Sequence, residues 1–140
     1  MTEDEILAAQ KSWGDAVVAV GRADRWEEAH ALATQLVKDH YLMDGSLLFC
    51  PTKAAVKQFR PDLEAAVSYF VGNNIKFHED RGFALEPWTA VRFENTGIQL
   101  TGDTAIAMGN YFFQSIGGRE LKVEFTFAYR AVAGSGIRIA

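Results

Sequence analysis

Hydrophobic residues recur at steps of three and four near the start of the chain, which places them on one face of a helix. They are Ile6, Ala9, Trp13, Val17 and Val20. Thr2 and Glu5 have the spacing of a capping box at the start of this helix, and Gly21 suits its end. A second stripe from Trp26 to His40 predicts a second helix.

The remaining pattern predicts one more helix and then strands. The segment RPDLEAAVSYFVG predicts a helix with Pro61 in its first turn and Gly72 at its end. From about Trp88 the hydrophobic period falls to two, and ELKVEFTFAYRA (120–131) alternates as a strand with one buried face does. TAIAMGNYFFQS (104–115) predicts a neighbouring strand, and tight turns are expected at 95–97 and 101–103. Helices followed by an antiparallel meander predict an α+β fold, as one domain over residues 1–140.

The turn between these strands decides which side chains face the helices. If Gly117 and Gly118 form a two-residue turn, Asn110 lies opposite Phe125 and Phe112 opposite Val123. The inner face then carries Ile106, Met108, Asn110, Phe112, Phe125, Phe127 and Tyr129. Tyr111 and Phe113 fall on the outer face, where exposed aromatics indicate an oligomer contact. A three-residue turn would reverse this parity.

Composition narrows the class of protein. Hydrophobic residues make up 49% and charged residues 23%, which is typical of a folded globular chain. The net charge is −4 and the basic residues are scattered, so nucleic acid is not expected as a partner. No apolar run approaches the eighteen or so residues of a membrane span, so a membrane is not expected either. One cysteine, Cys50, and an acidic start instead of a basic leader indicate the cytoplasm, or a plastid stroma after processing.

Few residues have the spacing of a reactive centre. His30 and His40 stand about 80° apart around a helix, too far to converge on one ion, and His78-Glu79-Asp80 favours a solvated charged loop. We therefore expect no metal and no other cofactor. Cys50 follows the apolar run 47–49, which favours a strand and a buried, inert thiol.

Two hydroxyl residues are open to structural or functional interpretation. Thr52, in LFCPTKAA, suits a turn or a helix cap, and Tyr69, in AVSYFVGNN, suits the boundary between core and solvent. Together with EDRGFALEPWTAVRFENTGIQLTGDTAIAMGNYFF and LKVEFTFAYR, these segments resemble the iota-class carbonic anhydrases over almost the whole chain. That family belongs to the nuclear-transport-factor-two-like superfamily and is related to the association domain of calcium/calmodulin-dependent kinase.

The resemblance implies a cone-shaped α+β fold, a homodimer formed through the outer face of the sheet, and metal-independent interconversion of CO2 and bicarbonate. It implies catalytic hydroxyls at Thr52 and Tyr69. The predicted inner face then supplies a substrate pocket, with Asn110, Phe112, Phe125 and Tyr129 as its expected binding residues.

One feature of the family pattern is missing from the chain. The last strand of the family runs into a His-His-Ser-Ser motif, whereas this sequence reads IRIA to Ala140. The alternative is therefore a non-catalytic binding or association module of the same fold. A cofactor-free isomerase or cyclase would need an acidic base on the inner face, and the predicted parity places none there.

Overall fold

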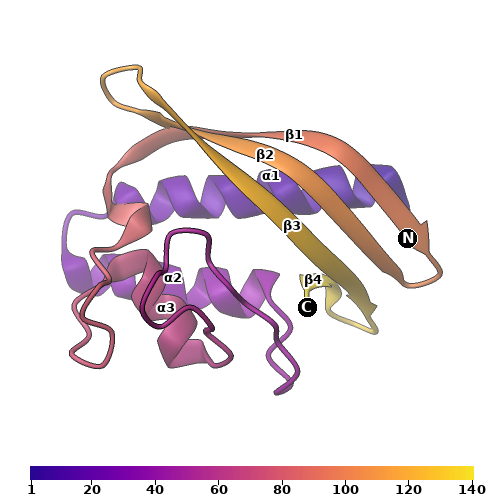
Figure 1. Cartoon of the computed structure of the whole chain (residues 1–140), viewed down its shortest axis with the longest axis horizontal. Helices are drawn as coiled ribbons and strands as arrows, with labels where there is room; N and C mark the ends of the chain where they lie inside the picture. The colour runs from indigo at the N-terminus through magenta and orange to yellow at the C-terminus, as the bar shows by residue number, and fades with distance from the viewer.

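The computed structural model describes residues 1–140 as helices packed on one face of an antiparallel sheet (Figure 1). The helices are α1 (Glu3–Gly21), α2 (Trp26–His40), α3 (Leu63–Val71) and the 3-10 turn η1 (Phe83–Leu85). The strands are β1 (Trp88–Thr101), β2 (Thr104–Ser115), β3 (Glu120–Val132) and β4 (Gly136–Ile139), and they are neighbours in chain order. The α+β prediction is confirmed. None of the helices has both the length and the apolar character needed to cross a membrane.

The helix boundaries follow from local hydrogen bonding. The capping box at the start of α1 is present: Glu5 N–H donates to Thr2 Oγ1 at 3.2 Å, and Thr2 N–H donates to Glu5 Oε2 at 2.7 Å. Helix α3 begins after Asp62, whose carboxylate accepts the N–H of Ala65 at 2.9 Å. Pro61 therefore precedes the cap, and its predicted place in the first turn is wrong.

The β2–β3 hairpin has a three-residue loop, Ile116–Gly118. Ser115 N–H donates to the carbonyl of Arg119 at 2.8 Å, and Gly118 adopts a φ of +85° that favours glycine. Tyr111 consequently pairs with Val123. The predicted two-residue turn is wrong, and the alternative with reversed parity on β2 is the one the protein adopts.

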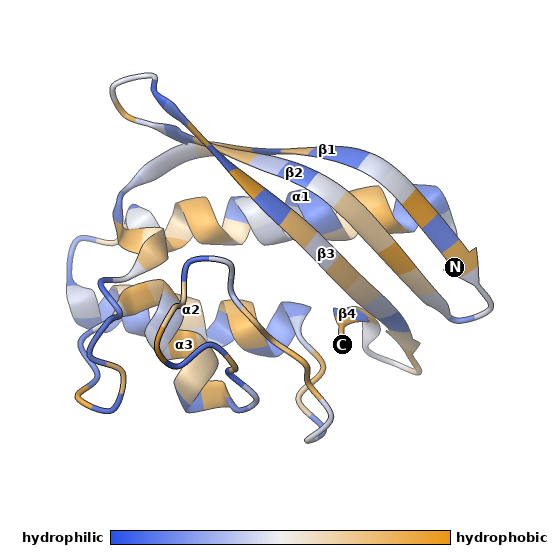
Figure 2. Cartoon of the chain, viewed as in Figure 1, coloured by the Kyte–Doolittle hydropathy of each residue, from blue (hydrophilic) through white to orange (hydrophobic).

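The reversed parity exchanges the two faces of β2. Tyr111 and Phe113 point toward the helices and are 9% and 0% exposed, so their predicted place on the outer face is wrong. Asn110 and Phe112 lie on the outer face instead. On β3 the predicted inner face is confirmed, because its residues from Val123 to Tyr129 are buried at every second position. The alternation is visible along the strands (Figure 2).

Strand β1 runs through residues 95–97, where the sequence predicted a turn. An irregularity in its pairing between Asn95 and Gly97 accommodates one extra residue instead, as a β-bulge does. Gly109 of β2 lies opposite this bulge, and a Cβ added there would come within 2.1 Å of the Glu94 carbonyl oxygen. The turn predicted at 101–103 is confirmed, because it joins β1 to β2.

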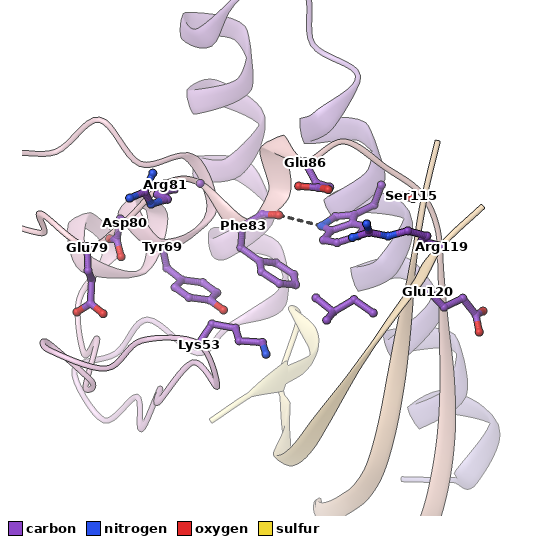
Figure 3. A pocket seen from close by; sticks show the side chains of 13 residues that line it. Lys53, Tyr69, Glu79, Asp80, Arg81, Phe83, Glu86, Ser115, Arg119 and Glu120 are labelled. Carbon is purple, nitrogen blue, oxygen red and sulfur yellow. Dashed lines mark hydrogen bonds between the residues drawn. The ribbon is translucent and has the colours of Figure 1, made fainter. Parts of the chain in front are cut away.

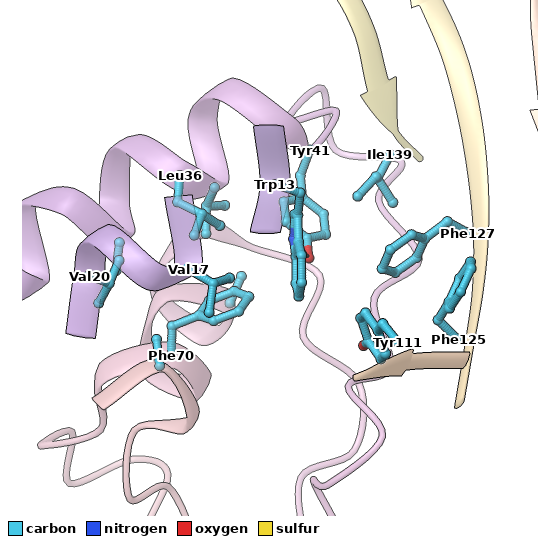
Figure 4. Close-up of a cluster of buried hydrophobic side chains, with 14 of the residues drawn as sticks. Trp13, Val17, Val20, Leu36, Tyr41, Phe70, Tyr111, Phe125, Phe127 and Ile139 are labelled. Carbon is cyan, nitrogen blue, oxygen red and sulfur yellow. Dashed lines mark hydrogen bonds between the residues drawn. The ribbon is translucent and has the colours of Figure 1, made fainter. Parts of the chain in front are cut away.

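Trp13 of α1 lies at the centre of the core (Figure 4). Its indole stacks on the Tyr111 ring at 5.4 Å between ring centroids and meets further rings edge-on or tilted. Those rings belong to Phe70, Phe93, Phe113 and Phe127. Aromatic residues from helices and sheet therefore form one connected cluster.

We predict that Gly109→Ala lowers the free energy of unfolding by about 2 kcal/mol or more, because the new methyl group overlaps backbone atoms that cannot move aside cheaply. Gly97→Ala is the matched control, since a Cβ there meets nothing within 4 Å. Urea unfolding of both variants measures the difference. Equal stabilities for the two would contradict the close approach at the bulge.

Candidate functional site

The chain between α2 and α3 carries Thr52 and has no regular secondary structure. The strand predicted at 47–49 does not form. Ala54 N–H donates to the Pro51 carbonyl at 3.0 Å, so Thr52 occupies the second position of a tight turn. Cys50 is exposed, and the predicted buried thiol is wrong.

The Thr52 hydroxyl ties this turn to the sheet. Its Oγ1 donates to the carbonyl oxygen of Glu124 in β3 at 3.1 Å. The hydroxyl proton is therefore engaged, and Oγ1 can still accept a hydrogen bond. Tyr111 lines the same space as Thr52.

Thr52 and Tyr69 line one small cavity of about 20 Å³, which we call the small cavity. A space of this size holds about one water molecule. Its lining residues come from α1, the loop before α3, α3 itself, η1 and the sheet. They are Trp13, Tyr41, Phe49, Pro51, Thr52, Tyr69, Phe70, Phe83, Tyr111, Val123 and Phe127. The two predicted catalytic hydroxyls are thus brought together within an aromatic wall.

The four predicted substrate-binding residues do not line this cavity. Asn110 and Phe112 lie on the opposite face of the sheet, which corrects their predicted position. Phe125 and Tyr129 are buried on the inner face as predicted, but outside the lining of the small cavity. Tyr111, which the sequence-based register turned outward, takes their place. The inward position of Tyr111 could have been predicted only if the length of the hairpin loop had been known.

The phenols of the cavity are held in their neutral form. Burial raises the pKa of Tyr69 to about 12, against the smaller opposite effect of a hydrogen bond from the Lys53 backbone. Burial also raises the pKa of Tyr111, and that of Tyr41 well above the ordinary value. All three can therefore donate hydrogen bonds at neutral pH.

A larger pocket of about 470 Å³ adjoins the small cavity, and Tyr69 and Phe83 line both (Figure 3). We call it the large pocket. Charged side chains of both signs surround it: Lys53, Glu79, Asp80, Arg81, Glu86, Arg119 and Glu120. Tyr69 therefore lies between the aromatic small cavity and the polar large pocket.

The histidines and acidic residues do not assemble a metal site. No three His, Cys, Asp or Glu side chains come together in a way that could hold an ion. Glu79 and Asp80 do not form the solvated loop that the sequence favoured, because Asp80 pairs with the buried Arg60 and its side chain is 2% exposed. Both carboxylates make contacts that hold the loop carrying Thr52 in place.

The fold and the hydroxyl-lined site together define an α+β domain with a small cavity between its helices and the inner face of an antiparallel sheet. The family model described as metal-independent carbonic anhydrase matches residues 4–140, and the chain belongs to that family. A curated metal-independent carbonic anhydrase from Nostoc sp. is 40% identical over 134 residues, which span 92% of this chain. The chain spans 65% of the length of that relative.

Solved structures agree with this assignment. The crystal structure of an iota-carbonic anhydrase from a cyanobacterium, complexed with bicarbonate, superposes with a TM-score of 0.95 at 39% identity, covering 99% of this chain and 88% of that one. A protein from Xanthomonas campestris described as a calcium/calmodulin-dependent protein kinase II association domain matches at a TM-score of 0.60 and 20% identity, over 96% of this chain and 80% of that one. The second likeness shows the shared fold alone.

The raised tyrosine pKa values predict a loss of stability in alkali. An unfolded tyrosine ionises near pH 10, so burial of the neutral phenol stabilises the fold fully below pH 10 and less as the pH rises toward 12, the folded pKa of Tyr69. The free energy of unfolding should fall by up to about 1.4 kcal/mol per pH unit for each tyrosine that stays neutral. Urea unfolding between pH 8 and 11.5, with tyrosinate absorbance of the folded protein, measures both quantities. Folded tyrosines that all titrate near pH 10 would contradict the burial argument.

Proposed function

We propose that this protein interconverts CO2 and bicarbonate without a metal ion, where the small cavity meets the large pocket beside Tyr69. The observation that carries the proposal is that Thr52, Tyr69 and Tyr111 line one space whose other walls are mostly aromatic. Membership of the metal-independent carbonic anhydrase family and the likeness to a structure complexed with bicarbonate support it.

The energetics favour a concerted reaction. A zinc ion lowers the pKa of bound water from 15.7 to about 7, which corresponds to about 12 kcal/mol at 1.36 kcal/mol per unit. Neutral hydroxyls do not supply a stabilisation of that size, so a preformed hydroxide is not the nucleophile. Water instead attacks the carbon of CO2 while it loses a proton to a neighbouring group.

The hydrogen bonding of Thr52 assigns the roles of the hydroxyls. Because Oγ1 already donates to the Glu124 carbonyl, Thr52 accepts a hydrogen bond from the attacking water, or from the hydroxyl of bicarbonate in the reverse direction. Tyr111 is neutral and donates to the oxygen that gains charge. Tyr69 faces the large pocket, so it can take up the proton from water on one side and release its own to solvent on the other.

Removing single hydroxyls tests this proposal. Thr52→Val, Tyr69→Phe and Tyr111→Phe should each lower kcat/KM for CO2 hydration about ten- to a hundredfold, because a hydrogen bond to a charged group contributes about 1.5–3 kcal/mol. Stopped-flow hydration assays give the rates, and circular dichroism confirms folding.

Thr89→Val is the matched control for Thr52. Thr89 Oγ1 also donates to a backbone carbonyl, that of Gln114 at 3.2 Å, but outside the cavity. Its activity should stay within about twofold of the parent. Exhaustive chelation should change nothing. An inactive, fully folded parent would favour the binding-module alternative, and an activity that EDTA abolishes and one divalent ion restores would refute metal independence.

We also propose that two copies associate through the outer face of the sheet. Ile106 and Met108 of β2 are 50% and 52% exposed there, beside Ala128 and Thr126 of β3. Phe112 adds an aromatic ring on the same face, with the Arg92 guanidinium 4.0 Å above it. Exposed apolar side chains gathered on one sheet face favour a protein contact. Tyr111 and Phe113 are buried in the core and are not part of it.

Charge placed on this face should keep the protein monomeric. Met108→Glu puts a carboxylate among apolar neighbours, where an interface would have to desolvate it, so sedimentation should show at least a tenfold weaker dimer. Ser135→Glu, in the exposed turn between β3 and β4, controls for the added charge. A parent that sediments as a monomer at micromolar concentration would contradict the dimer.

A further inference from the structure

Glu79 binds the backbone of the loop that carries Thr52. Its Oε1 accepts the N–H of Ala55 at 2.7 Å, and its Oε2 accepts those of Val56 and Lys57 at 2.9 and 2.7 Å. These hydrogen bonds lower the pKa of Glu79, so the carboxylate is charged at neutral pH. One side chain thus fixes three successive residues that begin shortly after Thr52.

Asp80 joins the far end of the same loop to the helix that carries Tyr69. Both its oxygens accept the Arg60 guanidinium, each at 2.8 Å, and Oδ2 also accepts the Ser68 hydroxyl at 2.5 Å. Arg60 is completely buried and donates as well to the carbonyls of Lys57 and Ala65. Ser68 directly precedes Tyr69 in α3. Asp80 is therefore bonded to both segments at once.

Few buried apolar side chains hold the loop, and its other contacts are mostly polar: Thr52 donates to the Glu124 carbonyl, and the Lys57 ammonium donates to the Lys76 carbonyl. The base of the loop is closed by the Arg60 N–H, which donates to the Phe49 carbonyl at 2.8 Å, and the Phe49 ring packs edge-on against Tyr69 at 6.2 Å. Residues 55–59 are exposed. A segment with few buried apolar contacts takes its conformation from its hydrogen bonds.

We propose that Glu79 and Asp80 are positioning residues that hold the Thr52 and Tyr69 hydroxyls at the geometry the reaction needs. Glu79 sets the course of the chain after Thr52, and Asp80 sets the distance between that loop and α3. The kinetic part of this inference rests on the proposed function, whereas the geometric part does not. Hydroxyl catalysts without a metal depend on such positioning, since a small displacement weakens every hydrogen bond to the transition state.

Glu79→Gln is the central test. The amide keeps the size of the side chain but replaces one acceptor oxygen with a donor that faces backbone N–H groups. We expect kcat/KM for CO2 hydration to fall about tenfold while the variant stays folded under the assay conditions, as circular dichroism checks. Glu64→Gln is the matched control, because Glu64 is an exposed carboxylate of α3 whose partners are the side chains of Asn74 and Lys76 and not the backbone of the loop. It should behave as the parent.

Double variants separate positioning from a general loss of structure. Thr52→Val already removes the hydroxyl, so a displaced loop can no longer weaken its hydrogen bond. Adding Glu79→Gln to Thr52→Val should therefore lower kcat/KM by less than about twofold further. If the losses of kcat/KM in the two single variants multiply in the double variant, the proposal is overturned. Asp80→Asn with Tyr69→Phe forms the second cycle. Because Asp80→Asn leaves Arg60 buried beside a neutral partner and can unfold the chain, the Glu79 cycle decides alone if it does.

Amide hydrogen exchange tests the geometry without any activity. In Glu79→Gln the amides of residues 52–57 should exchange at least tenfold faster than in the parent, while those of α1 are unchanged. Unchanged exchange in the loop would overturn the proposal even if activity fell. If the parent does not hydrate CO2, the proposed function fails, and the exchange rates still decide whether Glu79 holds the loop.

Discussion

The buried hydrogen bond from the Trp13 indole N–H to the Tyr41 hydroxyl, 3.0 Å long, is the contact on which the other layers depend. It joins the middle of α1 to the residue that ends α2, and the Trp13 ring packs at the same time against α3 and the inner face of the sheet. Loss of this indole would leave a cavity costing about 3–5 kcal/mol and an unpaired phenol. The small cavity is the space left between these packed aromatic rings.

Local chemistry made most of the fold predictable from the sequence. The capping box at Thr2, the periodic stripes of α1 and α2, and the alternation of β3 each depend on neighbours in the chain, and each is confirmed. The bulge in β1 was not predictable in this way. Asn95-Thr96-Gly97 has the composition of a turn, but pairing with β2 on one side overrides that preference.

The candidate site was predicted in part. Resemblance to a family placed Thr52 and Tyr69, and both line the same small cavity. Asn110 and Phe112 were assigned to the wrong face because the parity of a whole strand depended on a single undetermined residue in a turn. The role of Glu79 and Asp80 was invisible, since their partners are backbone groups and a buried Arg60 that are distant in sequence.

The three-residue loop between β2 and β3 has a consequence for how such proteins can diverge. Surface loops commonly gain or lose residues in evolution with little effect. A deletion in Ile116–Gly118 that shifted the pairing by one residue would instead exchange the phenol of Tyr111 for the amide of Asn110 on the inner face of the sheet. Homologues that keep the chemistry should therefore vary in the sequence of this hairpin loop while its length stays fixed.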